Sequence, residues 1–170
     1  MNIILFGFKS VGKTYIGKLL AKTLNISFID TDELLSKKFN MPCNELYKQL
    51  GSKSFLQEEK KVILSLKDTN NSVISCGGQT LLDNDNYLFL KKLGKLVFLK
   101  AKKQTLEKRI FQSKNPSFLK DKNIFDKEYN KRKSIYSALE ATQINIDNLE
   151  EKEIIGILTN LYSKEVKNGK

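Results

Sequence analysis

The chain has 170 residues, a length that suits one α/β domain with a sizeable buried core. It carries 30 basic and 19 acidic residues, for a formal net charge of +11, and it contains no histidine, so any general base must be a carboxylate, a lysine or a tyrosine. No apolar run approaches the roughly 20 residues of a membrane span, and no basic stretch or cleavage site precedes the first apolar run, so we expect neither a membrane partner nor a signal peptide.

The first predicted element is a buried parallel strand at residues 2–6, and a helical pattern then runs to about Leu24. Between them lies the segment Gly7-Phe8-Lys9-Ser10-Val11-Gly12-Lys13-Thr14, which has the form G-x-x-x-x-G-K-[ST]. A strand before this pattern and a helix after it favour a phosphate-binding loop over an ordinary glycine turn with a surface lysine. We call residues 7–14 the P-loop.

The residue types of the P-loop suit phosphate. Gly7 and Gly12 let backbone N–H groups turn inward around phosphate oxygens, and the start of the helix adds its positive end. Lys13 can reach the β- and γ-phosphates, and the Thr14 hydroxyl can ligate Mg²⁺. The sequence therefore predicts that the protein binds a nucleoside triphosphate.

The second predicted strand, at residues 27–29, ends at Asp30-Thr31-Asp32. In an extended stretch, residues two apart point the same way, so both carboxylates can face one pocket. Phosphoryl transfer needs an acidic group near Mg²⁺ and often a carboxylate that accepts the proton of the attacking hydroxyl. The alternative is that one of these aspartates only caps the helix that begins at Glu33.

The rest of the chain alternates helices with strands, which predicts a parallel sheet with helices on both faces and ligands at the carboxyl ends of the strands. Helical patterns fill residues 33–39, 44–67 (with breaks at Pro42 and Gly51), about 84–92, 103–112, about 124–139 and about 150–164. The further strands are residues 72–76, 95–99 and 143–146. Residues 113–123 show no periodicity and suggest a mobile loop, and we expect a frayed tail at residues 164–170.

Two further features are candidates for ligand contacts. Gly77 and Gly78 follow the third strand and would let a ligand approach the backbone closely, although a plain turn explains them too. Arg109 and Arg132 are the two arginines of the chain, and a planar donor suits a carboxylate or phosphate that must be held in fixed geometry. A surface arginine remains the alternative for each.

With these motifs in this order, the chain resembles the shikimate kinases over roughly residues 2–147. The resemblance implies a three-layer P-loop kinase fold with a five-stranded parallel sheet in the order 2-3-1-4-5, formed by a single domain. It also implies substrate-binding helices at residues 33–61, a lid at residues 112–124, and the use of ATP and Mg²⁺ to phosphorylate the 3-hydroxyl of shikimate.

The resemblance also assigns roles to residues. Asp30 would hold Mg²⁺ through water together with Thr14, Lys13 would be catalytic, and Asp32 would bind and help deprotonate the shikimate hydroxyl. Arg132, in the stretch Lys131-Arg132 followed by Tyr136, would clamp the shikimate carboxylate, and Gly77 and Gly78 would contact shikimate. The residues expected to contact ATP are Gly7, Ser10, Val11, Gly12, Lys13, Thr14, Tyr15 and Arg109.

Four positions depart from the family pattern. Ser10 replaces an extra glycine of the P-loop, and Gln79 replaces the third glycine of the turn. The F-R-x-x-E element reads Phe55-Leu56-Gln57-Glu58-Glu59, so Leu56 stands where the family has an arginine on the substrate carboxylate. The R-P pair of the lid reads Asn115-Pro116. Lys114 is a candidate to supply the lid charge, and Lys48 or Lys53 to replace the other arginine.

These departures leave two rivals to shikimate kinase activity. One is a related kinase with another acceptor, such as gluconate or a nucleotide, and the other is a weakly active ATP-binding relative that serves as an interaction or nucleic-acid-binding module. The lysines are spread over the whole chain without an RNA-binding signature, which favours solvated faces over a nucleic-acid partner. Cys43 and Cys76 indicate free thiols in a reducing cytoplasm, and the resemblance implies a monomer.

Overall fold

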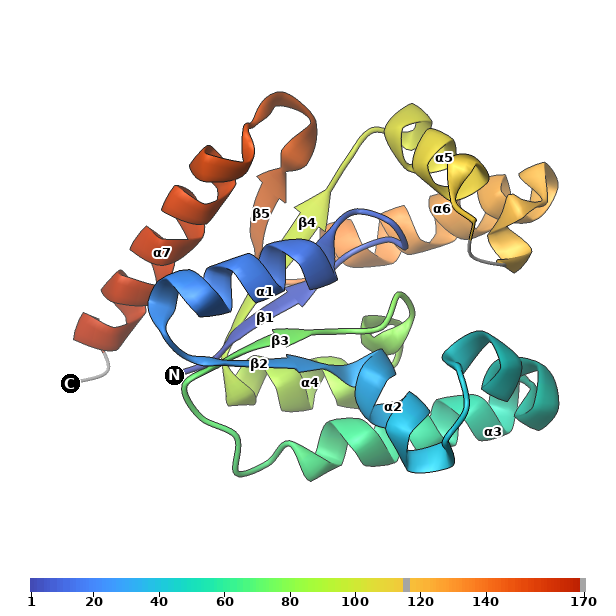
Figure 1. The fold of residues 1–170 in the computed structure, drawn as a ribbon, viewed down its shortest axis with the longest axis horizontal. Coiled ribbons are helices and arrows are strands. Elements are labelled where there is room, and N and C mark those ends of the chain that lie inside the picture. The colour runs from blue at the N-terminus through green and yellow to red at the C-terminus, as the bar shows by residue number, and fades with distance from the viewer. Residues whose placement is uncertain (115–116, 169–170) are drawn as a thin grey trace.

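The structure, a computed structural model, describes residues 1–114 and 117–168. Its strands form one parallel sheet in the order β2-β3-β1-β4-β5, which confirms the predicted order (Figure 1). The strands are β1 (Ile3–Phe6), β2 (Ser27–Asp30), β3 (Ser72–Ser75), β4 (Lys95–Lys100) and β5 (Thr142–Asn145). All neighbouring strands are parallel, so their carboxyl ends share one edge of the sheet.

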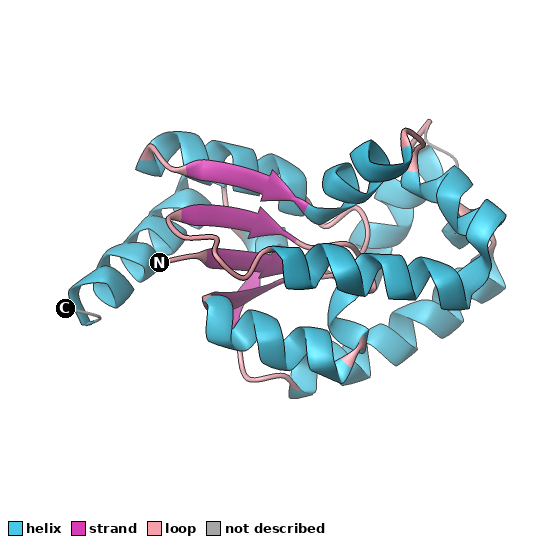
Figure 2. Ribbon diagram, turned by 90° about the horizontal axis from the view of Figure 1, so that it is seen from below, coloured by secondary structure: helices cyan, strands magenta, loops and turns pink. Residues whose placement is uncertain are grey.

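Both faces of the sheet are covered by helices (Figure 2), and this explains why the central strand β1 is apolar and buried at every position. In β1, Ile3 and Leu5 pack into a core cluster with residues of α1 (Lys13–Leu24), α5 (Lys103–Gln112) and α7 (Glu151–Asn168). Ile4 and Phe6 point to the opposite face and pack with residues of α3 (Cys43–Ser65) and α4 (Asn84–Leu93). The alternation of successive side chains thus builds two cores from one short strand.

A third, smaller cluster joins α2 (Thr31–Phe39) to α3 and contains Leu35, Leu46, Phe55 and Val62. It holds these two helices together beyond the edge of the sheet, in the region predicted to bind substrate. Gly51 interrupts α3, as predicted, with a non-helical backbone at φ 72° and ψ 168°. The half of α3 before the kink therefore runs in a different direction from the half that packs under the sheet (Figure 1).

The loop predicted at residues 113–123 is shorter than expected. A 3₁₀ turn occupies Phe118–Lys120, and α6 (Lys122–Ala138) begins before the predicted start at residue 124. The reason is local capping, because the Ser117 side chain accepts a hydrogen bond from the Leu119 N–H and the Asp121 side chain accepts one from the Ile124 N–H. Asn115 and Pro116 lie outside the described residues.

The last helix is longer than predicted, since α7 continues to Asn168 rather than ending at residue 164. Leu161 and Tyr162 pack against the core, and Glu165 forms an ion pair of 2.8 Å with Lys95. The predicted frayed tail is therefore helical up to this point, because tertiary contacts hold its first turn. Among the described residues, no helix is both long and apolar enough to cross a bilayer.

Candidate active site

A cavity of about 590 Å³ opens at the carboxyl ends of the strands. We call it the acceptor cavity. In Figure 1, α2 and α3 lie on one side of this edge and α5 and α6 on the other. The cavity is lined from both sides: by P-loop and strand-end residues Lys9, Ser10, Lys13, Thr14, Asp30, Asp32, Ser75, Cys76, Gly78 and Gln79, by Cys43, Asn44, Tyr47, Lys48, Phe55 and Glu59, and by Ser117, Phe118, Leu119 and Arg132.

The P-loop adopts the left-handed backbone that its glycines predict, with φ 148° at Gly7 and 106° at Gly12. Ser10 also has a positive φ, 65°, at the position where the family has glycine, so this loop accommodates a strained serine. The Gly12 cap of α1 uses no side chain, and the first turn of α1 contains no acidic residue. Its first N–H groups are thus available to an anion, as a phosphate site requires.

Replacing Gly7 with alanine should destabilise the fold by about 2–5 kcal/mol. A Cβ atom there would lie 2.3 Å from the Leu99 carbonyl oxygen, which belongs to the backbone and cannot move aside. Gly51→Ala is a control for backbone strain alone, since Gly51 also has a positive φ but a Cβ atom there meets nothing within 4 Å, and its cost should be about 1–3 kcal/mol, below that of Gly7→Ala. Urea unfolding of both variants tests this, and equal losses would contradict it.

Lys13 folds back over the P-loop, where its Nζ donates hydrogen bonds to the carbonyl oxygens of Gly7 (2.9 Å) and Phe8 (3.1 Å). Desolvation by the surrounding protein lowers the pKa of Lys13 to about 8, against the raising influence of Asp32, Cys76 and Asp30. The ammonium group is therefore short of counter-charge, and a bound polyphosphate would supply it.

Asp30 has two roles at once. Its Oδ1 caps α2 by accepting hydrogen bonds from the N–H groups of Asp32 (3.0 Å) and Glu33 (3.3 Å), while its Oδ2 accepts one from the Thr14 hydroxyl (2.8 Å). The helix therefore begins at Thr31, and the expectation that Asp30 and Asp32 share one extended stretch is wrong. Both carboxylates nevertheless line the acceptor cavity, because the first turn of α2 points toward it.

The donor set suits Mg²⁺. The Thr14 hydroxyl and the Asp30 carboxylate lie together at the P-loop, and the described residues contain no group of three or more histidine, cysteine or acidic side chains that could hold a metal ion. Mg²⁺ keeps several waters and is held through one or two protein oxygens and the substrate phosphates, whereas a structural zinc site needs four protein ligands. The residues present therefore fit Mg²⁺ bound together with a nucleotide.

Asp32 faces the cavity without serving as the helix cap. The surrounding protein raises the pKa of its carboxyl group, Asp30 adds to this effect, and Lys13 and Lys9 oppose it. The Asp32 side chain is exposed to the cavity, so water moderates the shift until a substrate fills the space. A carboxylate with a raised pKa beside a phosphate site is suited to accept a proton.

Arg132 is 2% exposed and lies in the cavity wall. Its Nε and Nη2 donate to Glu128 Oε2 at 3.0 and 2.7 Å, its Nη1 donates to the Gly78 carbonyl oxygen at 3.0 Å, and its guanidinium lies over the Phe8 ring at 5.1 Å. The Tyr136 hydroxyl donates to the same Gly78 oxygen at 2.8 Å. These contacts fix the guanidinium, and Glu128 neutralises much of its charge.

Glu59 is a site residue that the sequence interpretation did not assign a role. It is 4% exposed, accepts a hydrogen bond of 2.8 Å from the Thr80 hydroxyl, and lines the cavity. The missing side chain of Gly77 leaves room for the Asp32 and Glu59 carboxyl groups, because a Cβ atom at Gly77 would lie 2.6 Å from Asp32 Oδ1 and 2.8 Å from Glu59 Oε1. The Gly77 N–H is already bound to the Thr31 hydroxyl, so Gly78, rather than Gly77, borders the cavity.

Glu59 should make stability depend on pH. Burial raises its pKa to about 7, with Asp32 and Asp83 adding to the shift and Thr80 and Arg132 opposing it. Because the folded pKa lies above the unfolded value, the native state holds the proton more tightly, and stability falls as pH rises from about 4.5 to about 7. Glu59→Gln should therefore stabilise the protein at pH 8, by about 1–3 kcal/mol, and far less at pH 5. Urea unfolding at the two pH values checks this, and a gain that is equal at both would contradict it.

Several predicted residues lie away from the cavity. The Tyr15 side chain is 63% exposed and its hydroxyl bonds to Glu151, and the Val11 side chain is fully buried in the core, so only their backbone can face a phosphate. Arg109 lies beside the P-loop, with its Nη1 near the carbonyl oxygens of Ser10 (3.3 Å) and Val11 (3.4 Å). Leu56 is 38% exposed and does not line the cavity.

Part of the segment predicted as the lid lines the cavity. Phe118 stacks on Tyr47 of α3 with ring centroids 6.0 Å apart, so a residue of the lid and a residue of the helix pair α2–α3 meet at the cavity wall. Tyr47 also packs against Phe55 at 5.2 Å. The two sides of the cavity thus touch through aromatic side chains, which suits a site that excludes water around its substrate.

Comparison with known proteins agrees with this geometry. Residues 9–162 match the family model described as shikimate kinase. A shikimate kinase of Clostridium botulinum (strain ATCC 19397 / Type A) is 34% identical over 167 residues, or 96% of each chain, and one of Caldicellulosiruptor saccharolyticus is 38% identical over 120 residues, or 71% of this chain and 70% of the relative. The solved structure of shikimate kinase from Bacteroides thetaiotaomicron has a TM-score of 0.85 at 27% identity and covers 96% of this chain and 98% of that one. A match of this extent, together with the strand order and the P-loop geometry, shows that the chain belongs to the shikimate kinase family.

Proposed function

We propose that the protein transfers the γ-phosphoryl group of ATP to the 3-hydroxyl of shikimate, as the family membership supports. The observation that carries this proposal is the division of labour between the two aspartates. Asp30 is occupied by the α2 cap and Thr14, whereas Asp32 faces the acceptor cavity without capping α2. A site that separates a metal-side carboxylate from an acceptor-side carboxylate suits transfer to an alcohol.

Each side chain has a distinct part in this transfer. The P-loop N–H groups and Lys13 bind the β- and γ-phosphates and stabilise the charge that develops there. Thr14 and Asp30 would hold Mg²⁺, which neutralises charge on the phosphate oxygens when bound. Asp32 accepts a hydrogen bond from the attacking hydroxyl and then takes its proton. Arg132, fixed by Glu128 and Gly78, presents its remaining N–H groups to the acceptor.

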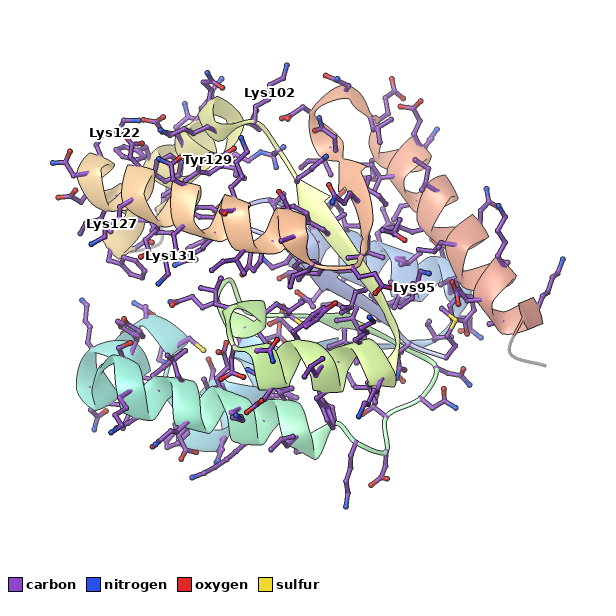
Figure 3. All side chains as sticks on the ribbon, turned by 180° about the vertical axis from the view of Figure 1, so that it is seen from behind. Lys95, Lys102, Lys122, Lys127, Tyr129 and Lys131 are labelled. Carbon is purple, nitrogen blue, oxygen red and sulfur yellow. The ribbon has the colours of Figure 1, made fainter. Side chains whose placement is uncertain are left out.

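We further propose that the protein works as a monomer in the cytoplasm without a nucleic-acid partner. Cys43 and Cys76 are free thiols, which fits a reducing compartment. Of the lysines labelled in Figure 3, Lys122, Lys127 and Lys131 belong to α6, while Lys95 belongs to β4. Lys122 has the acidic partners Glu107 and Asp126, and Lys95 pairs with Glu165. Such pairing supports solvated faces. Size-exclusion chromatography with light scattering tests the monomer.

The function is tested by measuring ADP release with ATP, Mg²⁺ and shikimate, beside a control without acceptor and a control with gluconate. Shikimate-dependent turnover that is absent with gluconate is the expected result. ATP binding without turnover on shikimate would contradict the proposal and would favour another acceptor. Salt-sensitive binding to oligonucleotides together with no turnover on any acceptor would favour a binding module instead.

A further inference from the structure

Four cationic side chains line the acceptor cavity: Lys9, Lys13, Lys48 and Arg132. The proposed acceptor carries a carboxylate, and a carboxylate in a partly enclosed site needs a positive partner. Lys13 is directed to the P-loop carbonyls, on the phosphate side. Arg132 already has Glu128 as an ion-pair partner at 2.7 Å, so the Arg132–Glu128 pair adds little net positive charge. Lys9 and Lys48 are therefore the two candidates for an additional positive partner of the acceptor carboxylate.

Lys9 belongs to the P-loop, between Gly7 and Gly12, in the segment predicted to hold phosphate. Its backbone lies beside Gly78, where a Cβ atom would lie 3.7 Å from the Lys9 nitrogen. A cation on the P-loop is placed to pair with phosphate oxygens, so Lys48 is the unpaired cation of the cavity lining outside the phosphate site.

Lys48 is placed differently. It belongs to the half of α3 that precedes the Gly51 kink, one helical turn after Asn44 and next to Tyr47, and all three residues line the cavity. Within the part of the chain that the structure describes, the side chain of Lys48 has no hydrogen bond or ion pair. Its flexible four-carbon stem allows the ammonium group to follow a ligand. Across the cavity lies Arg132, on α6.

We propose that Lys48 binds the carboxylate of the acceptor and supplies the positive charge that Leu56 cannot supply. This inference rests on the proposed function, because it assumes a carboxylate-bearing acceptor. Leu56 is exposed outside the cavity, and Lys53, the other nearby lysine on α3, does not line the cavity either. The kink at Gly51 separates Lys48 from both, since it changes the direction of the helix between them. The positive charge thus lies on the half of α3 that precedes Gly51, and Leu56 lies on the half that follows it.

Steady-state kinetics of Lys48→Ala and Lys53→Ala test the inference. Both changes remove one charge from an exposed position of α3 and introduce a good helix former, so both variants should fold. We expect Lys48→Ala to raise the KM for shikimate about 10- to 100-fold with the KM for ATP unchanged, and Lys53→Ala to leave both values unchanged. Equal effects of the two substitutions would overturn the inference and would indicate only a loss of net charge.

The carboxamide analogue of shikimate, which is neutral, isolates the contact. The wild-type protein should have a higher kcat/KM for shikimate than for the carboxamide. In Lys48→Ala the ratio of these two kcat/KM values should fall by about the same factor by which the KM for shikimate rises. Lys48→Arg should retain the preference. A preference that is unchanged in Lys48→Ala would overturn the inference. Failure of the proposed function is a different result, since the wild-type protein would then show no turnover on shikimate.

Discussion

Asp32→Asn is expected to lower kcat for shikimate phosphorylation by about 10²- to 10⁴-fold, the usual contribution of a positioned general base. Asparagine keeps the size and one hydrogen bond of the side chain but cannot take a proton. Because Asp30, and not Asp32, caps α2, the change leaves the cap intact and removes a like charge near Asp30. The KM for ATP and the melting temperature should therefore stay at or above the wild-type values.

The matched control is Asp30→Asn. Asparagine caps helices about as well as aspartate, so α2 should persist with the amide oxygen at the cap, but the group that faces Thr14 becomes an amide NH₂, which can neither accept the Thr14 hydrogen bond nor ligate Mg²⁺. This variant should need more Mg²⁺ for half-maximal activity and should approach wild-type kcat at high Mg²⁺, whereas Asp32→Asn should not recover. Undiminished phosphorylation of shikimate by Asp32→Asn would rule out Asp32 as the base.

Lys13→Ala is expected to reduce kcat/KM for ATP by about 10³-fold or more, since it removes the cation nearest the transferred phosphoryl group. The substitution should not lower the free energy of unfolding. Burial lowers the pKa of Lys13 to about 8, so the fold disfavours its charged form at neutral pH. In the wild type, the free energy of unfolding is therefore lowered by Lys13 below pH 8, and it should rise as the pH increases from about 8 toward the pKa of lysine in the unfolded chain. Lys13→Ala should show no such rise.

Thermal melts with and without ATP and Mg²⁺ separate the two effects. The wild-type melting temperature should rise with the nucleotide, and that of Lys13→Ala should rise much less while starting at an equal or higher value. A lower starting value would mean that Lys13 stabilises the P-loop through its bonds to Gly7 and Phe8 more than its burial costs. Normal ATP turnover by the variant would exclude the catalytic role.

The order of elements and the phosphate site were accessible from the sequence because both depend on local patterns. Alternation of apolar strands with helical periods determines a parallel sheet, and the P-loop pattern carries its own backbone requirement in Gly7 and Gly12. The kink in α3 was accessible for the same reason, since Gly51 interrupts a helical pattern. Each of these features is decided within a few residues of chain.

Features that depend on distant contacts were not accessible. The helix cap is a local exception: capping by one of the two aspartates was an open alternative in the sequence, and the structure shows that Asp30 forms the cap. The partner of Arg132 was visible as a residue four positions earlier, Glu128, but its near-complete burial depends on Phe8 and Gly78 from other parts of the chain. The sequence likewise left Lys48 and Lys53 as equal candidates, and only the direction of α3 after its kink separates them.

The break in α3 has a consequence for how acceptor preference can be altered. Pro42 begins this helix, Gly51 breaks it, and the intervening half-helix contributes one residue, Leu46, to the fully buried part of the small cluster shared with α2. It can therefore be exchanged as a cassette between related kinases, provided that Leu46 and the two breaks are kept. Since the sheet, the P-loop and the aspartates lie outside the cassette, a library of such exchanges would sample new acceptors while the phosphate donor site stays the same.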